Sequence, residues 1–208
     1  MNIIKIRKEG TATFVGCLIP IGSHYEANNI KGISHFIEHM CFKGSPTMTR
    51  KDIDSAIEGV GGDINAYTSE EVTFYHCTIA NRYKDMAIKV IKDLALNPIF
   101  PAKEVDKERE VIIQEMKMYE DNPQASAGDL FNRTYYPKNS PFHIGTIGTK
   151  ESLYSIGRKE LIAFHKEHYN IPTLIVIGDV DDFEEVDYSQ KMKTTENIIY
   201  KQKQNKYF

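Results

Sequence analysis

The chain has 208 residues, of which 41% are hydrophobic and 26% charged, and its 26 basic and 29 acidic residues give a formal net charge of −3. This composition is typical of a globular domain and excludes disorder as the dominant state, because the apolar content is too high and the net charge too small. A sequence-independent nucleic-acid binder would carry a basic excess, which disfavours that class. The longest apolar stretches are far shorter than the roughly 20 residues that span a membrane as a helix.

The cysteines and the first residues indicate a cellular location. Cys17, Cys41 and Cys77 are an odd number without a CxxC spacing, so we expect free, buried thiols in a reducing compartment. The first ten residues contain neither the apolar segment nor the cleavage site of a secretory signal. The sequence therefore predicts a cytoplasmic protein, with no membrane and no nucleic acid among its partners.

Predicted strands and helices follow one another along most of the chain. The first twenty residues predict two strands around a turn at Glu9 and Gly10. Helical spacing of apolar residues predicts helices over 28–42, 49–58, 83–96, 101–120, 123–135 and 158–169. Residues rich in β-branched and apolar side chains predict further strands over 63–68, 72–80 and 173–178.

This order of elements predicts an α+β fold, in which helices pack on one face of a mixed, mainly antiparallel sheet. No repeat or flexible linker interrupts the pattern, so residues 1–182 form a single predicted domain. Residues 183–208 are polar and Lys-rich, which indicates a weakly ordered tail.

The most informative segment is HFIEH at residues 35–39, which lies inside a predicted helix. Residues four apart lie on one face of a helix, so the imidazoles of His35 and His39 can reach one metal ion. Glu38 lies beside that face, where its carboxylate can address a water on the metal without being a ligand itself. A chance match or a satisfied pair of surface histidines is the alternative interpretation.

A catalytic zinc site uses three protein ligands, so two histidines need a further partner. Glu108 and Glu115 are seven residues apart on one face of the predicted helix 101–120, with Ile112 between them. A carboxylate on an apolar face costs free energy unless it is paired or bound to a metal. This helix therefore offers a candidate carboxylate ligand, and a charged flank of the helix is the alternative.

Other polar and aromatic side chains are weaker candidates. His165 and His168 could bind a metal from one helix, but no carboxylate motif accompanies them, and we expect capping or packing roles. Cys41 is predicted to be a core residue, and His76 a hydrogen-bonded core histidine. We expect loop positions for His24 and His143, and aromatic packing, with cleft lining as the alternative, for Tyr119, Tyr135 and Tyr136.

These segments together resemble a known family. The stretches at 32–40, 42–45, 62–68, 97–98, 108–115 and 178–181 resemble motifs of the inverted-motif zinc peptidases, the family of pitrilysin, insulin-degrading enzyme and mitochondrial processing peptidase. The resemblance covers roughly residues 12–182, and the motifs are specific in combination.

The resemblance implies a role for each site residue. It implies three zinc ligands, namely His35, His39 and Glu115. Glu108 would steady the site from behind, and Glu38 would take a proton from the attacking water and pass it to the leaving amine. Asn65, Ala66 and Tyr67 would form an edge strand along which an extended peptide binds, although an ordinary hairpin strand is the alternative.

The resemblance also implies a partner. Fully active members have a second homologous domain, in the same chain or in a companion chain, whose Arg and Tyr side chains help to hold the substrate carbonyl. We assign no such half and no Arg/Tyr motif in this sequence. The resemblance therefore predicts a zinc endopeptidase subunit that acts on short or unfolded peptides. This subunit would pair with a homologous companion chain in a heterodimer rather than with a second copy of itself. A non-catalytic peptide-binding or scaffold subunit is the alternative, and the intact HxxEH segment favours catalysis.

Overall fold

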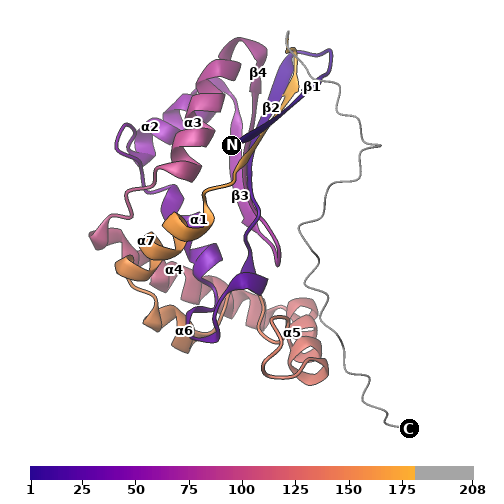
Figure 1. The fold of residues 1–208 in the computed structure, drawn as a ribbon, viewed down its shortest axis with the longest axis vertical. Coiled ribbons are helices and arrows are strands. Elements are labelled where there is room, and N and C mark those ends of the chain that lie inside the picture. Colours follow the sequence, from indigo (N-terminus) through magenta and orange to yellow (C-terminus); the bar gives the residue numbers. More distant parts are fainter. Residues whose placement is uncertain (181–208) are drawn as a thin grey trace.

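The computed structural model describes residues 1–180, so the predicted boundary at residue 182 and the tail of residues 183–208 lie outside the described residues. Within the described part, the helices and strands form the predicted α+β arrangement (Figure 1). None of the described helices combines the length and apolar content that crossing a membrane requires.

A five-stranded sheet forms one layer of the fold, in the order β1-β5-β2-β4-β3. The strands are β1 (Asn2–Arg7), β2 (Ala12–Ile19), β3 (Asp63–Thr68), β4 (Thr73–Ala80) and β5 (Thr173–Gly178). β1 runs parallel to β5, and the other neighbouring pairs are antiparallel. The prediction of a mixed, mainly antiparallel sheet is confirmed, and β3 is an edge strand among the described residues.

The two N-terminal strands are not neighbours in the sheet. The chain turns between them near Glu9 and Gly10, as predicted, but β5 lies between β1 and β2 and pairs with both. On β5, Leu174 and Val176 are only 4% and 2% exposed. A central position buries these side chains, whereas an edge position would leave them closer to solvent.

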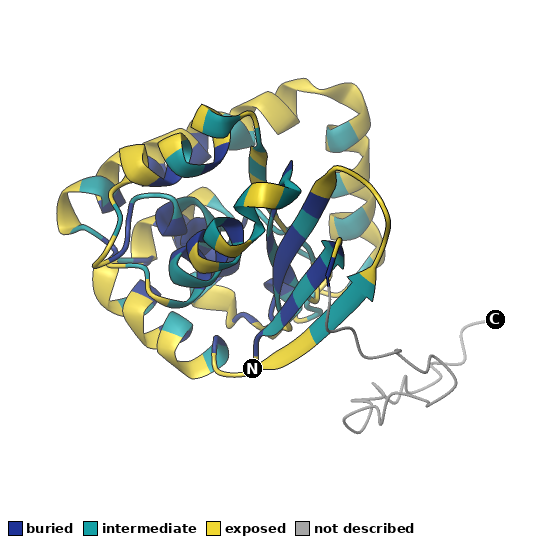
Figure 2. Ribbon diagram, turned by 90° about the horizontal axis from the view of Figure 1, so that it is seen from above, coloured by how far each residue is buried: buried dark blue, intermediate teal, exposed yellow. Residues whose placement is uncertain are grey.

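The helical layer lies on one face of this sheet, as predicted: α1, α2 and α3 make the main contacts with the strands, α4 and α7 pack against α1, and α5 and α6 pack against α4 (Figure 1). They are α1 (Ile33–Cys41), α2 (Arg50–Ile57), α3 (Lys84–Leu96), α4 (Ala102–Asp121), α5 (Pro123–Tyr135), α6 (Lys150–Ser155) and α7 (Arg158–His168). Alternate side chains of the strands point to this helical layer, so Cys17 on β2 and Tyr75 and Cys77 on β4 are fully buried. Figure 2 shows this buried layer between the sheet and the helices.

Two helix predictions differ from the structure. The predicted helix 28–42 is interrupted, because Asn28–Ile30 form a separate 3-10 turn and α1 begins only at Ile33. Gly32 has a left-handed φ of 92°, and a Cβ there would lie 2.5 Å from the carbonyl oxygen of Ile147. The short helix α6 was not predicted, because six residues give too little periodicity to recognise.

The prediction that His76 is a hydrogen-bonded core residue is wrong. Buried and partly buried residues alternate along β4, and His76 lies on the partly buried side, which no described helix covers. Its ring stacks with those of Phe14 and Phe74, at centroid distances of 5.7 and 5.5 Å. The apolar neighbours in the sequence indicated burial, but the two-residue period of the strand places this side chain on the other face.

A buried carboxylate fixes the start of α1. Glu26 is 5% exposed, and its two oxygens accept hydrogen bonds of 2.8 Å from the backbone N–H groups of Gly32 and Ser34. The first N–H groups of a helix have no partner within the helix, so this side chain satisfies two of them. Burial raises the pKa of Glu26, and the two N–H groups and the neighbouring Lys31 oppose that rise. A residue outside the helix thus holds its N-terminus in place.

We predict that Glu26→Ala lowers the free energy of unfolding by about 2–4 kcal/mol, because it leaves two buried N–H groups without an acceptor. Chemical denaturation followed by circular dichroism measures this change. Glu9→Ala is the matched control, because Glu9 is exposed and its removal should change stability by less than about 0.5 kcal/mol. Equal stabilities of the two variants would contradict the role assigned to Glu26.

Candidate metal centre

Helices α1 and α4 bring together the three residues that the sequence suggested as ligands. His35 and His39 come from α1, and Glu115 comes from α4. The Nε2 atoms of the two histidines are 3.2 Å apart, and Glu115 Oε2 lies 3.7 Å from His35 Nε2 and 3.4 Å from His39 Nε2. One carboxylate oxygen and two imidazole nitrogens therefore face a common point.

The size of this triangle can be compared with that of a zinc site. Ligand atoms of tetrahedral zinc lie about 2.0–2.2 Å from the metal, which separates them from one another by about 3.3–3.5 Å. The three observed distances of 3.2, 3.4 and 3.7 Å lie close to this spacing. The donor set of two imidazoles and one carboxylate also suits zinc, and three protein ligands leave the fourth position open. The residues present fit a catalytic zinc ion.

Glu108 supports His39 from the side opposite the triangle. Its Oε1 lies 3.0 Å from His39 Nδ1, and its Oε2 lies 2.5 Å from Nζ of Lys43. Burial acts to raise the pKa of Glu108, but hydrogen bonds from His39 and Lys43 hold it below its ordinary value. A proton on Nδ1 of His39 donates to this carboxylate, which leaves Nε2 free to act as a ligand atom.

The two histidines differ in their affinity for protons. Burial and the neighbouring His39 lower the pKa of His35 to about 4. Burial also acts to lower the pKa of His39, but hydrogen bonds to Glu108 and Glu115 raise it to about 9. Without a metal, the cluster of the two histidines and Glu115 therefore favours one bound proton, on His39. A metal ion would replace that proton. His35 Nδ1 is buried and has no hydrogen-bond partner among the described residues.

Glu38 lies beside the triangle and is held by the edge strand. Its Oε2 accepts a hydrogen bond of 2.5 Å from the hydroxyl of Thr68, the last residue of β3. Burial raises the pKa of Glu38, and the Thr68 hydrogen bond opposes this rise. A carboxylate with a raised pKa can hold a proton closer to neutral pH, as a general base requires. Glu38 and the strand next to it are therefore joined by one hydrogen bond.

A cleft of about 770 Å³ opens over these residues. His35, Glu38 and Glu115 line it, together with Ala66 and Tyr67 of β3 and part of α5. Ala66 and Tyr67 of the edge strand therefore form part of the cleft wall, whereas Asn65, the third residue of the predicted peptide-binding strand, does not line the cleft.

The alternative metal pair is not part of this cluster. His165 Nε2 lies 2.9 Å from the carbonyl oxygen of Ala95, and the ring of His168 packs on Phe164 at a centroid distance of 4.3 Å. The predicted capping or packing roles of these two histidines are confirmed. Cys41 is fully buried, as predicted, with its Sγ 3.3 Å from the Tyr75 hydroxyl.

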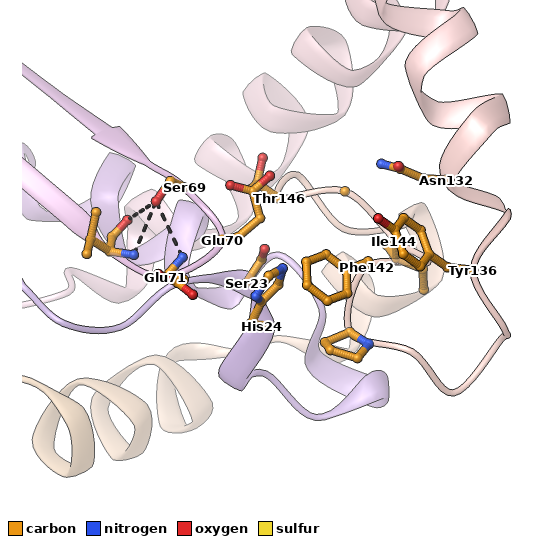
Figure 3. A pocket seen from close by; sticks show the side chains of 13 residues that line it. Ser23, His24, Ser69, Glu70, Glu71, Asn132, Tyr136, Phe142, Ile144 and Thr146 are labelled. Atoms are coloured by element: carbon orange, nitrogen blue, oxygen red, sulfur yellow. Dashed lines mark hydrogen bonds between the residues drawn. The ribbon is translucent and has the colours of Figure 1, made fainter. Parts of the chain in front are cut away.

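The remaining candidates lie at different places around the cleft. Tyr119 lines the cleft, so of the two alternatives for this residue the structure shows cleft lining. Tyr135 is 68% exposed and stacks on Phe131. His24, which lies in a 3-10 turn, and Tyr136 line an adjacent cavity (Figure 3). His143 lies in a loop, as predicted, and its Nδ1 is 2.9 Å from the Tyr136 carbonyl oxygen.

Sequence reasoning assigned no role to Glu26, Lys43 or Thr68. Lys43 and Thr68 lie in segments that carry the family resemblance, which was the available signal. Their partners are Glu108 and Glu38, at 65 and 30 positions along the chain, so spacing could not reveal these contacts.

The sequence is also similar to known families and proteins. The sequence model of the insulinase family, peptidase family M16, matches residues 3–149. An uncharacterised zinc protease of Rickettsia felis is 36% identical over 169 residues, which are 80% of this chain and 41% of that protein. The β subunit of the mitochondrial-processing peptidase of Mus musculus is 35% identical over 162 residues, which are 78% of this chain and 33% of that subunit. The chain thus spans less than half the length of these relatives.

Solved structures share the fold. A protease from Helicobacter pylori superposes with a TM-score of 0.81 at 24% identity, covering 86% of this chain and 44% of that protease. Pitrilysin superposes with a TM-score of 0.76 at 19% identity, covering 86% of this chain and 20% of pitrilysin. Because the family match covers most of the chain, and relatives over 30% identical cover more than two thirds of it, the chain belongs to the insulinase family of peptidases, family M16.

Proposed function

We propose that the chain is the catalytic subunit of a zinc-dependent endopeptidase that hydrolyses short or unfolded peptides. The observation that carries the proposal is the triangle of His35, His39 and Glu115 with Glu38 beside it, at the bottom of a cleft. The name of the Rickettsia felis relative, a zinc protease, supports both the metal and the reaction class. When bound, zinc supplies a Lewis acid that polarises a peptide carbonyl and acidifies a water molecule.

Residues of the chain transfer the proton and hold the ligand side chains in place. Glu38 accepts the proton of the attacking water and returns it to the leaving amine, and the Thr68 hydroxyl fixes the direction of its carboxylate. Glu108 and Lys43 hold the His39 ring in one orientation and one tautomer. The chemistry therefore needs contacts from α1, α4 and β3 at the same time.

The edge strand β3 supports the choice of substrate. Among the described residues it pairs only with β4, so no strand covers its outer edge, where the Ala66 N–H donates to Asn65 Oδ1 at 2.8 Å and an extended peptide could pair in place of that contact. Main-chain pairing of this kind places few demands on sequence but requires an extended chain. Short or unfolded peptides meet that requirement, whereas most segments of folded proteins do not.

We further propose that a homologous companion chain completes the site and that the protein works in the cytoplasm. The relatives above are more than twice as long as the matched part, and the mouse relative is named as one subunit of a peptidase. Apolar side chains on α5 also remain exposed, among them Leu130, Phe131 and Tyr135, at 66%, 56% and 68%. Three free, buried cysteines suit a reducing compartment.

The alternative is a subunit that binds peptides in the same cleft or acts as a scaffold, without cleaving them. The cleft and the edge strand would serve binding equally well. A complete set of ligands together with a partly buried carboxylate of raised pKa favours catalysis, because neither is needed to hold a peptide.

We predict about one zinc ion per chain by elemental analysis and its loss in His39→Ala, because two ligands bind zinc far more weakly than three. His168→Ala is the control, since that ring packs on Phe164 away from the cluster. Full zinc content in His39→Ala would disprove the assigned ligands.

We predict that Glu38→Gln keeps its zinc and its affinity for peptide but lowers the turnover number by about 100-fold or more, because the amide cannot accept a proton. The matched control is Glu120→Gln, which removes an exposed carboxylate from the same cleft. Peptide cleavage by Glu38→Gln at the rate of the unmodified protein would rule out this mechanism. Binding without cleavage by both the unmodified protein and its variant would favour the scaffold alternative.

We predict that the purified chain cleaves extended peptides slowly, and that a homologous companion raises the rate by orders of magnitude. The physical reason is that the second half supplies further groups to orient the substrate and exclude water. Light scattering and peptidase assays with and without the companion measure association and rate. A monomer with full activity by itself would contradict the need for a partner.

A further inference from the structure

Of the three candidate ligands, Glu115 is the one that its surroundings restrain least. Its side chain is 28% exposed, compared with 13% for His35 and 20% for His39. The ring of His39 is held through its Nδ1 by Glu108, and the ring of His35 is the most deeply buried of the three. The Glu115 carboxylate instead reaches the triangle with one oxygen, Oε2, from the end of a flexible side chain. Some other group must therefore fix its orientation.

The part of α4 that carries Glu115 also has few contacts with the core. The buried residues of this helix all precede Glu115, and they are Val105, Glu108, Arg109, Ile112 and Ile113. Among the later apolar residues, Met116 is partly buried against the core, whereas Met118 is 72% exposed. Core packing therefore places the backbone at residue 115 but leaves the carboxylate free to rotate.

Tyr119 lies one turn after Glu115, on the side of α4 that borders the cleft. Residues four apart lie one above the other on a helix, and long side chains point back toward the helix N-terminus, over the preceding turn. The ring of Tyr119 is therefore directed over Glu115. Tyr119, Glu115 and Glu38 all line the same cleft, and Tyr119 is 52% exposed there.

The electrostatic surroundings of the Tyr119 hydroxyl agree with this placement. Burial raises the pKa of Tyr119, and the charge of Glu115, a hydrogen bond to Glu115 and the charge of Glu38 add to the rise. A hydrogen bond with His39 is the main cause that lowers the pKa of Glu115, and the bond with Tyr119 acts in the same direction. An ionised carboxylate can only accept, so the phenol is the donor in this contact.

We propose that Tyr119 is a positioning residue of the metal centre, whose hydroxyl donates to the Glu115 carboxylate and so holds Oε2 toward the two imidazoles. The inference rests on the proposed function, because it requires that the triangle binds zinc. A carboxylate that rotated freely would spread its two oxygens over several positions, including the open fourth position where water binds. A hydrogen bond to one oxygen removes that freedom, as such contacts do for other metal ligands.

The zinc affinity of the full chain, measured by competition with a coloured chelator, tests this proposal without any peptide. Tyr119→Phe removes the hydroxyl and keeps the ring, so the affinity should fall by about tenfold. Tyr135→Phe is the matched control, because Tyr135 is 68% exposed on α5 and does not line the cleft, and it should keep the affinity. Without zinc, both variants should unfold at the temperature of the unmodified chain, since both hydroxyls belong to exposed residues.

Tyr119→Ala separates the hydroxyl from the ring. If the hydrogen bond is what matters, Tyr119→Phe loses most of the affinity that Tyr119→Ala loses. If the ring acts by packing alone, Tyr119→Phe keeps the affinity and only Tyr119→Ala loses it, and this result would overturn the proposal.

Cobalt in place of zinc shows whether Tyr119 acts through the ligand. The visible absorption of Co²⁺ depends on the number and arrangement of its ligand atoms. At saturating cobalt, the absorption bands of Tyr119→Phe should therefore differ in position and strength from those of the unmodified chain, and those of Tyr135→Phe should not. A general loss of stability would weaken binding but leave the spectrum at saturation unchanged.

The outcomes separate the role of Tyr119 from the proposed function. Unchanged zinc affinity in Tyr119→Phe, an equal loss in Tyr135→Phe, or an unchanged cobalt spectrum would each overturn the positioning role, while the metal centre stands. Failure of the unmodified chain to bind zinc would overturn the proposed function, and the role of Tyr119 with it.

Discussion

The buried carboxylate of Glu108 is the contact on which the rest of the site depends. It is 6% exposed, and an unpaired charge at that depth would cost several kcal/mol. His39 and Lys43 both bond to it, which ties α4 to α1 and sets how far one helix is shifted along the other. Seven residues later, two turns and about 10 Å along α4, Glu115 returns to the same face and meets the two Nε2 atoms. The position of the carboxylate in the triangle therefore follows from a contact made two turns away.

Three contacts from residues outside the helix hold α1, and each acts at a different point. Glu26 holds its N-terminus, Thr68 holds Glu38 near its middle, and Glu108 holds His39 close to its end. The opposite side of α1 is closed by the core, where Phe36 and Ile37 are fully buried. A helix of nine residues has little stability by itself, so these contacts and the core give it one position. Such restraint suits a metal site, where ligand atoms must stay within a few tenths of an ångström.

The sequence predicted those features that depend on local spacing. The four-residue interval of His35 and His39 and the seven-residue interval of Glu108 and Glu115 each place two side chains on one helix face, and both pairs lie on helices as expected, although α1 begins later than predicted. What spacing cannot predict is which faces meet. The place of β5 between β1 and β2 is set by the burial of its apolar side chains, and the break before α1 is set by the approach of residue 147 to Gly32. The support from Thr68 and Lys43 arises in the same way, from contacts between segments far apart in the chain.

The two walls of the cleft differ in how firmly the described chain holds them. On one side, α1 is tied to the core through fully buried residues, and β3 is held by its pairing with β4, by the partly buried Ile64 and Ala66, and by the hydrogen bond between Glu38 and Thr68. On the other side, α5 contains no buried residue, although its Asn122 cap and its contacts with α4 keep it helical. Its cleft-facing residues are polar or small, and its outward residues, such as Leu130 and Phe131, are large and apolar. A helix with that distribution is stabilised when another surface covers its outer face, because burial of apolar area is the larger contribution. The companion chain that we propose would therefore do more than add catalytic groups: by covering α5, it would hold the far wall of the cleft at a fixed distance from the metal centre.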